Sequence, residues 1–331
     1  VFTQAFCFLD KTTLSILLHI LMKKFYIGGI ILVILVLLWS TYHADLPIEL
    51  LKQKYADSSS QFFEFEGMQV PYRDQGEGVP LYLLHGTGAS LHTWDVWTEK
   101  FLQAGYRVIR VDLPAYGLTG PHPDGDYSPT MYLSMLEALR GHVQADSLVI
   151  VGNSFGGFLS WQYAISYPEQ VQKMVLIDPS GAPRPEETDR NPPLIVRLAR
   201  TKGVGEVLSK FTPRSIIEGN LKQVYHNDSL IAEETIDRYH EMSLREGNRQ
   251  AFIDRVRNPY RAGGWEQLPS LTLPTLILWG EHDEWIPVRD AEAFHQAIPS
   301  SRVVIFPHLG HVPMEEDPLG TVGEVLSFIS E

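Results

Sequence analysis

The feature that most constrains the fold is an alternation of short apolar runs with helical stretches, which begins near Gln61. Runs rich in Val, Ile and Leu lie at 81–84, 107–111, 148–152, 171–177, 275–279 and 303–306. Apolar runs of this kind indicate strands buried on both faces, and intervening helices allow neighbouring strands to run parallel. The pattern predicts an α/β fold with a mostly parallel, doubly wound sheet.

One interval of the chain breaks this rhythm. Residues 182–268 are rich in charge and in helical periods, with helices expected at 194–208, 229–245 and 249–257, and contain no strong strand. We therefore expect a domain at 61–331 that opens with a hairpin and carries a helical cap inserted at 182–268.

Composition limits the chemistry of the chain. With 27 Lys and Arg against 40 Asp and Glu, the net charge is −13, which argues against nucleic acid as a partner because such binding needs a basic face. The single cysteine, Cys7, excludes an internal disulfide, a cysteine-based zinc site and an iron–sulfur cluster. We expect no metal and no organic cofactor, so any chemistry must come from Ser, His and carboxylates.

The N-terminal part contains an apolar run. Residues 25–42 carry no charge, follow Lys23 and Lys24, and precede Asp45 and Glu49. This length and this charge asymmetry predict a transmembrane signal anchor at 22–43, with the rest of the chain on the extracytoplasmic, periplasmic side. The alternative is a cleaved signal peptide and a secreted product, although the run is long for one and no A-x-A site follows.

The flanks of this run are interpreted separately. Met22 followed by two lysines resembles a natural bacterial start, so residues 1–21 are interpreted as an upstream extension. Residues 44–60 are polar and end in three serines, which predicts a linker between the anchor and the domain.

The strongest motif is GNSFG at 152–156, placed directly after an expected strand and before an expected helix. Its glycines permit a sharp strand-to-helix turn that exposes the hydroxyl of Ser154 at a helix N-terminus. The alternative is an ordinary Gly/Ser N-cap turn. The context favours Ser154 as a nucleophile.

A serine nucleophile needs a base, and the base needs an acid that orients it. After the last expected strand, His311 is the favoured base and His308 is its rival. Asp283 follows the preceding strand and is the favoured acid. Three other carboxylates remain alternatives to it: Glu281, Glu284 and Asp178. All of these positions follow the carboxyl ends of strands, where open α/β sheets build their sites.

The segment HGTG at 85–88 supplies the fourth part of the predicted site. Its glycines allow backbone N–H groups to converge on an oxyanion, and the donors would be the amides of Thr87 and Phe155. A plain Gly-rich turn is the alternative, whereas a phosphate loop is disfavoured because no G-K-[ST] follows.

Together these motifs resemble the α/β-hydrolase family of esterases, C–C bond hydrolases, haloalkane dehalogenases and haloperoxidases. The marks are HGTG at 85–88, DLPAYG at 112–117, GNSFGG at 152–157, GEHD at 280–283 and GH at 310–311. Haloalkane dehalogenases in this family use Asp as nucleophile, so Ser154 disfavours carboxylate alkylation. The family often has Gly where Ala115 stands in a motif that we interpret as structural.

The resemblance implies a serine hydrolase that cleaves a small carboxylic ester through an acyl-enzyme on Ser154, His311 and Asp283. C–C bond hydrolysis of a diketone-type substrate can use the same three residues and remains an alternative. A non-catalytic, membrane-anchored scaffold on the same fold is a third reading, because fold alone does not guarantee activity.

Overall fold

The structure is a computed structural model that describes residues 11–183, 201–257 and 263–331. The chain divides into two compact units, Val1–His43 and Ala44–Glu331, which are described separately.

In the first unit the described residues form helix α1, Lys11–Thr41. The helix covers nearly all of the predicted anchor at 22–43 but begins eleven residues before Met22, inside the predicted extension. Among the described residues, no helix is both long enough and apolar enough to cross a bilayer.

The second unit is built on an eight-stranded sheet with the order β1-β2-β4-β3-β5-β6-β7-β8. The strands are β1 (Ser60–Phe65), β2 (Met68–Gln75), β3 (Pro80–Leu84), β4 (Arg107–Val111), β5 (Leu148–Asn153), β6 (Val171–Ile177), β7 (Thr275–Gly280) and β8 (Ser301–Phe306). Strand β2 pairs antiparallel with β1 and β4, and every other pair is parallel. The predicted hairpin and mostly parallel sheet are therefore present.

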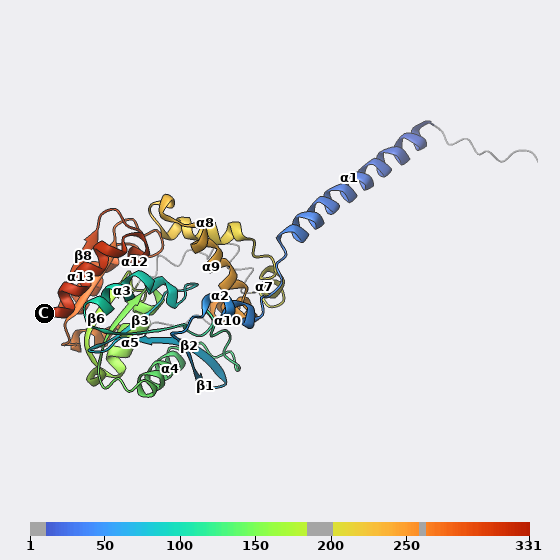
Figure 1. Ribbon diagram of the computed structural model, residues 1–331. Helices are drawn as coiled ribbons and strands as arrows, with labels where there is room; N and C mark the ends of the chain where they lie inside the picture. Colours follow the sequence, from blue (N-terminus) through green and yellow to red (C-terminus); the bar gives the residue numbers. More distant parts are fainter. Residues whose placement is uncertain (1–10, 184–200, 258–262) are drawn as a thin grey trace, which may run out of the picture. The chain divides into compact units, whose positions relative to one another are not determined.

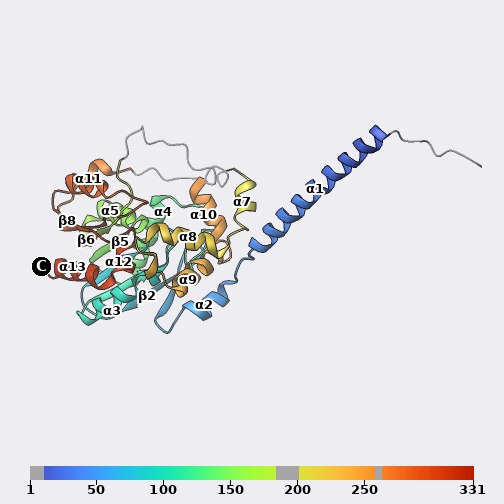
Figure 2. The ribbon, with the colours of Figure 1, turned by 90° about the horizontal axis from the view of Figure 1, so that it is seen from above.

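Helices cover both faces of this sheet (Figures 1 and 2). The helices are α2 (Ile48–Tyr55), α3 (Asp95–Gln103), α4 (Pro129–His142), α5 (Phe155–Ser166), α7 (Val204–Leu208), α8 (Arg214–Val224), α9 (Glu233–Leu244), α10 (Asn248–Arg257), α11 (Arg289–Ala297), α12 (Pro313–Glu316) and α13 (Pro318–Ser330). Short 3₁₀ turns lie at Leu91–Trp94, Pro168–Gln170, Asp228–Leu230 and Trp265–Ser270.

Strand β3 shows how the two cores arise. Tyr82 and Leu84 point into the core formed with α4, α5 and α11, whereas Leu81 and Leu83 point into the core formed with α3 and α13. Successive side chains of a strand face opposite sides of the sheet. A strand whose residues are all apolar is therefore buried on both faces. This double burial fixes the carboxyl ends of the central strands, where the site residues follow.

The described part of the cap is helical, as predicted. Helices α9 and α10 fall within or next to the expected ranges 229–245 and 249–257, and α7 falls within 194–208, of which 194–200 lies outside the described residues. Helix α8 was not expected. Its Ile217, Leu221 and Val224 recur at the spacing of one helix face, so the sequence did carry a signal for this helix.

The predicted linker at 44–60 is wrong, because most of it packs on the second unit. We call residues 44–55 the strap. Its Leu51 is buried beside Leu118 and Met242, and Leu46 pairs its backbone with the end of α9 through its N–H and C=O groups. The polar average of this segment hides the apolar positions that hold it down.

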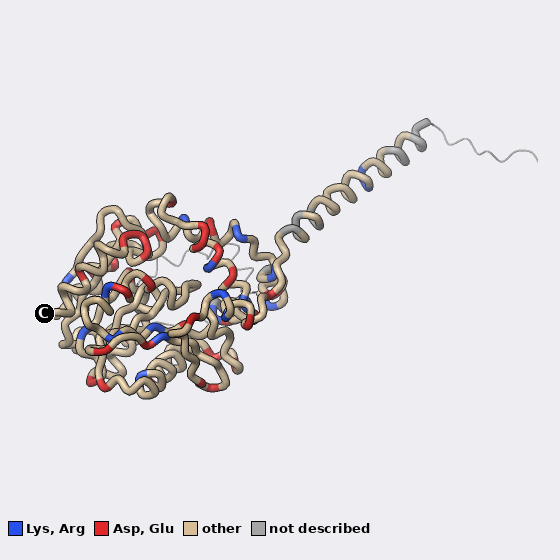
Figure 3. Tube along the Cα trace, in the orientation of Figure 1, with Lys and Arg blue, Asp and Glu red and all other residues tan. Residues whose placement is uncertain are grey.

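Charged residues show no segregation by sign along the described chain. Lys and Arg are scattered among Asp and Glu over the second unit (Figure 3). Many of them form ion pairs between partly exposed side chains, such as Arg107 with Asp74 and Arg214 with Asp237.

Candidate active site

Ser154 occupies a strained turn between β5 and α5. Its φ is +55° and its ψ is −114°, a region that a residue with a side chain rarely adopts. Neighbouring glycines make the turn possible, because a Cβ at Gly152 would lie 2.2 Å from the Gly156 carbonyl oxygen. A Cβ at Gly156 would lie 2.1 Å from the Leu84 carbonyl oxygen. The two glycines of the GNSFG motif thus allow a close approach of the backbone around β5 and α5 that a residue with a Cβ would prevent.

His311 and Asp283 form a buried pair. The Nδ1 of His311 lies 2.6 Å from the Oδ2 of Asp283, and the other carboxylate oxygen accepts hydrogen bonds from the N–H groups of Trp285 and Ile286. A carboxylate held by backbone donors in this way fixes the ring orientation and the tautomer of the imidazole. The Nε2 of His311 is then the nitrogen left for proton transfer.

The loop that carries His311 is anchored on both sides. The backbone N–H of His311 donates to the Val224 carbonyl at 2.7 Å, and the Asn153 side-chain amide donates to the His311 carbonyl at 3.0 Å. Glu316 accepts from the N–H of Gly310 at 2.6 Å. Sequence reasoning singled out neither Asn153 nor Glu316 for this role, although Asn153 lies inside the GNSFG motif.

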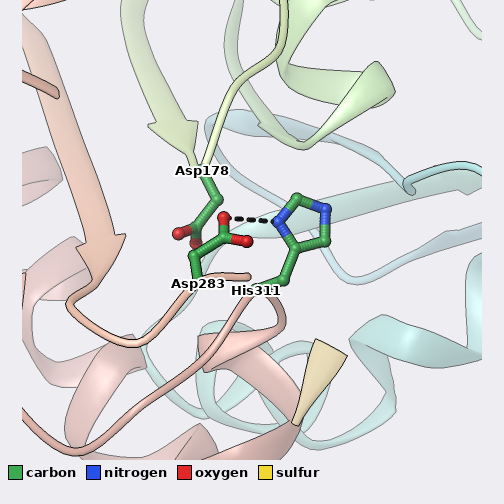
Figure 4. Close-up of side chains that lie close together, drawn as sticks. All are labelled: Asp178, Asp283 and His311. Carbon is green, nitrogen blue, oxygen red and sulfur yellow. Dashed lines mark hydrogen bonds and ion pairs between the residues drawn. The ribbon is translucent and has the colours of Figure 1, made fainter. Parts of the chain in front are cut away.

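The alternatives to these residues fall into two groups. His308, Glu281 and Glu284 are exposed and lie outside the buried pair. Asp178 is fully buried, and its carboxyl lies beside Asp283 (Figure 4). One atom each from Asp178, Asp283 and His311 lie within 4.8 Å of one another, a spacing that would also suit a cation. The Nδ1 of His311 is already bonded to Asp283, and Asp178 accepts a hydrogen bond from the N–H of Gly280.

The HGTG segment follows β3 beside Ser154. His85 is buried, donates from Nδ1 to the Gly86 carbonyl, and accepts at Nε2 from the Leu113 N–H. Burial lowers the pKa of His85 to about 4, which keeps the ring neutral as this pattern requires. The neutral ring thereby holds the loop that presents Thr87 to the site.

Ser154 and His311 line one cavity of about 460 Å³. Gly86, Thr87 and Gly88 form part of its core wall. The opposite wall comes from the cap and is largely apolar: Phe211, Ile216, Ile217, Leu221, Met242, Phe252 and Ile253. The Ser154 hydroxyl and the His311 ring face this space without a direct hydrogen bond, as is common before substrate binds.

Four aromatic residues differ in their surroundings. Phe252 lines the cavity, whereas Trp265 packs against Trp161 and Phe294. Trp94 and Trp97 are fully buried in the core, as ordinary packing residues.

The DLPAYG motif is structural. The Asp112 carboxylate accepts from the N–H groups of Leu91 and Leu118 and so ties two loops together; burial raises its pKa to about 6. Ala115 has φ of +76°, a left-handed conformation that explains why glycine suits this position.

Two arginines of the cap lie near the cavity. Arg249 is one of its lining residues and bonds Asp45 of the strap at 2.5 Å. Arg255 contacts the hydroxyls of Thr87 and Tyr116 and stacks 4.0 Å from the centre of the Phe155 ring. Neither was identified from the sequence, which places them more than 90 residues after the nucleophile.

Comparisons with known proteins cover most of the chain. A sequence model described as "alpha/beta hydrolase fold" matches residues 79–318. A 2-hydroxymuconate semialdehyde hydrolase of Pseudomonas putida is 30% identical over 258 residues, 74% of this chain and 85% of that protein.

Two solved structures extend the comparison. A thermophilic esterase from Thermogutta terrifontis superposes with a TM-score of 0.67 at 24% identity, over 82% of this chain and 97% of that one. A bacterial membrane phospholipase A superposes with a TM-score of 0.68 at 23% identity, over 96% of this chain and 97% of that one. At these identities the two likenesses show the fold.

Proposed function

Because the chain belongs to the α/β hydrolase fold family and is a hydrolase, we propose that it cleaves a carboxylic ester through an acyl-enzyme on Ser154. The observation that carries this proposal is that Ser154, His311 and Thr87 line one cavity. Ser154 stands there with strained dihedrals, and His311 is bonded to Asp283.

The reaction needs only these groups. His311 Nε2 takes the Ser154 proton as Oγ attacks the ester carbonyl, and the oxyanion is received by the N–H groups of Thr87 and Phe155. His311 then gives the proton to the departing alcohol, which leaves the acyl-enzyme. A water molecule that gives its proton to His311 then attacks the acyl-enzyme carbonyl. This step releases the carboxylic acid and restores the Ser154 hydroxyl.

The cavity favours a neutral, apolar acyl group. Its cap wall is mainly aliphatic and aromatic, and Arg249, the one Lys or Arg among its described lining residues, is paired with Asp45. An anionic substrate would have to compete with that carboxylate. An aliphatic chain instead gains about 0.8 kcal/mol for each methylene that it buries.

A series of p-nitrophenyl esters tests this proposal. We expect kcat/KM to rise by about fourfold for each added methylene, which is the value that this burial energy gives, until the cavity is full. The control is Ser154→Ala, which measures the background. A panel in which no ester exceeds that background contradicts the ester proposal.

A second candidate is hydrolysis of a C–C bond in a diketone-type acid. The name of the Pseudomonas putida relative, 2-hydroxymuconate semialdehyde hydrolase, suggests a substrate of this kind. The observation in its favour is Arg255, whose guanidinium contacts Thr87 beside the proposed oxyanion donors. A substrate carboxylate near Thr87 would meet that charge. Turnover of a vinylogous diketo acid but of no ester, abolished by Arg255→Gln, would establish this candidate over the first.

A non-catalytic scaffold is separated from both enzymes by covalent labelling. A fluorophosphonate probe reacts with an activated serine whatever the natural substrate is. Labelling of the folded protein that is lost in Ser154→Ala supports an enzyme, whereas folded protein that stays unlabelled supports a scaffold.

We also propose membrane attachment through the uncharged run at 25–42, with the catalytic unit on the periplasmic side. The run carries no charge and follows two lysines, the asymmetry expected of an anchor whose leading flank stays in the cytoplasm. Carbonate-washed membranes from expressing cells test this proposal. Retention of the full-length chain supports an anchor, and recovery of a shortened form in the supernatant supports cleavage.

A further inference from the structure

The buried carboxyl of Asp178 has no part in the mechanism above, yet it lies against the acid of the triad. Asp178 follows β6 with a φ of +43° and is fully buried. Its Oδ1 accepts from the N–H of Gly280 at 3.0 Å, and its own N–H donates to the Leu278 carbonyl. The backbone of β7 thus holds the side chain beside Asp283.

The second oxygen of this carboxyl poses a problem of hydrogen bonding. Oδ2 of Asp178 is buried and accepts no hydrogen bond from the described residues, and the Asp178 side chain lies beside another carboxyl, that of Asp283 (Figure 4). Two ionised carboxylates both accept and cannot bond each other, and a buried charge without a partner is costly. A single proton between them removes both difficulties.

The neighbouring hydrogen bonds decide which carboxyl holds the proton. Asp283 accepts from three N–H donors, those of Trp285, Ile286 and the His311 ring. Asp178 accepts from one. Each donor stabilises the ionised form, so the charge belongs on Asp283 and the proton on Asp178.

We propose that Asp178 is protonated at neutral pH and donates a hydrogen bond to Asp283, so that the two neighbouring carboxyls carry one negative charge, which lies on Asp283. The inference rests on the proposed triad and makes Asp178 a positioning residue. It holds Asp283 toward His311 without adding a second charge beside the imidazole.

The surroundings of Asp178 agree with this assignment. Burial, followed by the negative charges of Asp283 and Glu316, raises the pKa of Asp178 well above its ordinary value. His311 is the cationic partner during catalysis, and it bonds Asp283 directly. The left-handed backbone of Asp178 is the only strain that this arrangement requires. Asp tolerates that conformation better than most residues.

The pH profile of kcat/KM distinguishes this arrangement from a merely structural one. Asp178→Asn replaces a neutral donor by a neutral donor, so we expect both the rate and the acidic limb of the profile to stay where they are. If Asp178 were ionised, its removal would take a negative charge from beside the imidazole and move that limb to lower pH by about one unit or more. Such a shift would overturn the proposal.

Asp178→Ala provides the matched comparison. It removes the donor, and a hydrogen bond to a charged group contributes about 1.5–3 kcal/mol, so we expect kcat/KM to fall by about tenfold or more while the Asn variant retains its rate. Equal losses in the two variants would contradict donation to Asp283.

Infrared spectroscopy of the resting protein gives a readout that needs no substrate, so it stands even if the ester proposal fails. At pH 8, above the pKa of about 6 of buried Asp112, we expect a carboxylic-acid C=O band in the wild type that is absent from Asp178→Asn. If the variant does not fold, the same band should vanish when the wild type is unfolded in denaturant. A folded wild type without this band refutes the proposal.

Discussion

The two walls of the cavity are held in place by different forces. At the strand ends, Ser154 and His311 are fixed by backbone dihedrals, glycine contacts and buried hydrogen bonds to main-chain groups. The cap wall is held by apolar packing of Leu221 and Val224 of α8 against the core and by ion pairs between partly exposed side chains, such as Arg257 with Glu206. Exposed pairs contribute little, about 0–1 kcal/mol each.

This difference separates chemistry from selectivity. A change at the strand ends should affect every substrate alike, because it alters the reacting groups. A change in the cap should alter the preference among substrates, because it moves a wall that contacts the acyl group. The predictions below test that division, beginning with the largest effect.

Ser154→Ala should reduce kcat/KM for all esters by about 10⁴-fold or more, since removing a triad nucleophile has effects of this order or greater. The measurement is steady-state kinetics over several chain lengths. Ser160→Ala, a buried serine on the same helix that bonds the Gly156 carbonyl, is the control and should keep fluorophosphonate labelling. A loss of activity confined to long-chain esters would contradict the assignment of chemistry to the strand ends and of selectivity to the cap.

His85 should make the core sensitive to acid. Its pKa is lowered to about 4 by burial, so the unfolded chain binds a proton near pH 6.5 before the folded chain does. The stability that neutral His85 contributes is present above pH 6.5 and is lost as pH falls toward 4, by about 3 kcal/mol for this difference in pKa.

Urea unfolding of the wild type and of His85→Gln at several pH values checks this. The stability difference between the two should shrink from pH 7 to pH 4, and the comparison cancels the opposite effect of Asp112, whose raised pKa stabilises the fold as pH falls. A difference that does not change with pH would show that His85 is not held neutral.

Phe252→Ala should lower kcat/KM for long-chain esters by about tenfold and leave an acetyl ester unchanged. Phe252 lines the cap wall, and removing an aromatic side chain forfeits roughly 1.5–3 kcal/mol of apolar contact. Val207→Ala is the matched control, because Val207 is an exposed apolar cap residue outside the lining. An equal loss on acetyl and long-chain esters would place Phe252 in the chemistry instead.

Asp45→Ala should have the smallest effect, a change of about threefold in the preference between long and short esters. Asp45 joins the strap to Arg249 in the cavity wall and to Lys210, and a partly exposed pair contributes about 1 kcal/mol at most. Glu49→Ala, which removes an exposed pair with Lys52, is the control. Unchanged selectivity in Asp45→Ala would show that the strap does not position the wall.

The sequence predicted the central parts of the site because they depend on local rules. A turn that only glycine permits marks Ser154, and apolar runs mark the strands whose ends carry Asp283 and His311. The order of these motifs along the chain then suggested how they meet. The role of each in catalysis is tested by the variants above.

Other features depended on contacts between distant segments. Asn153 bonds the His311 carbonyl across 158 residues of sequence, and Asp178 lies beside Asp283 only because β6 and β7 are neighbours. The strap was predicted to be part of a linker. Its Leu51 is buried by Leu118 and Met242, which lie far from it in the sequence.

The sequence alone determined the sheet, the helical cap and the turn at Ser154, because strand burial and glycine geometry act over a few residues. The tertiary structure decided which carboxyls stand together, which arginines are paired and which cap side chains face the cavity. Charge and burial depend on every neighbour in space, and those neighbours come from strands and helices far apart in the chain.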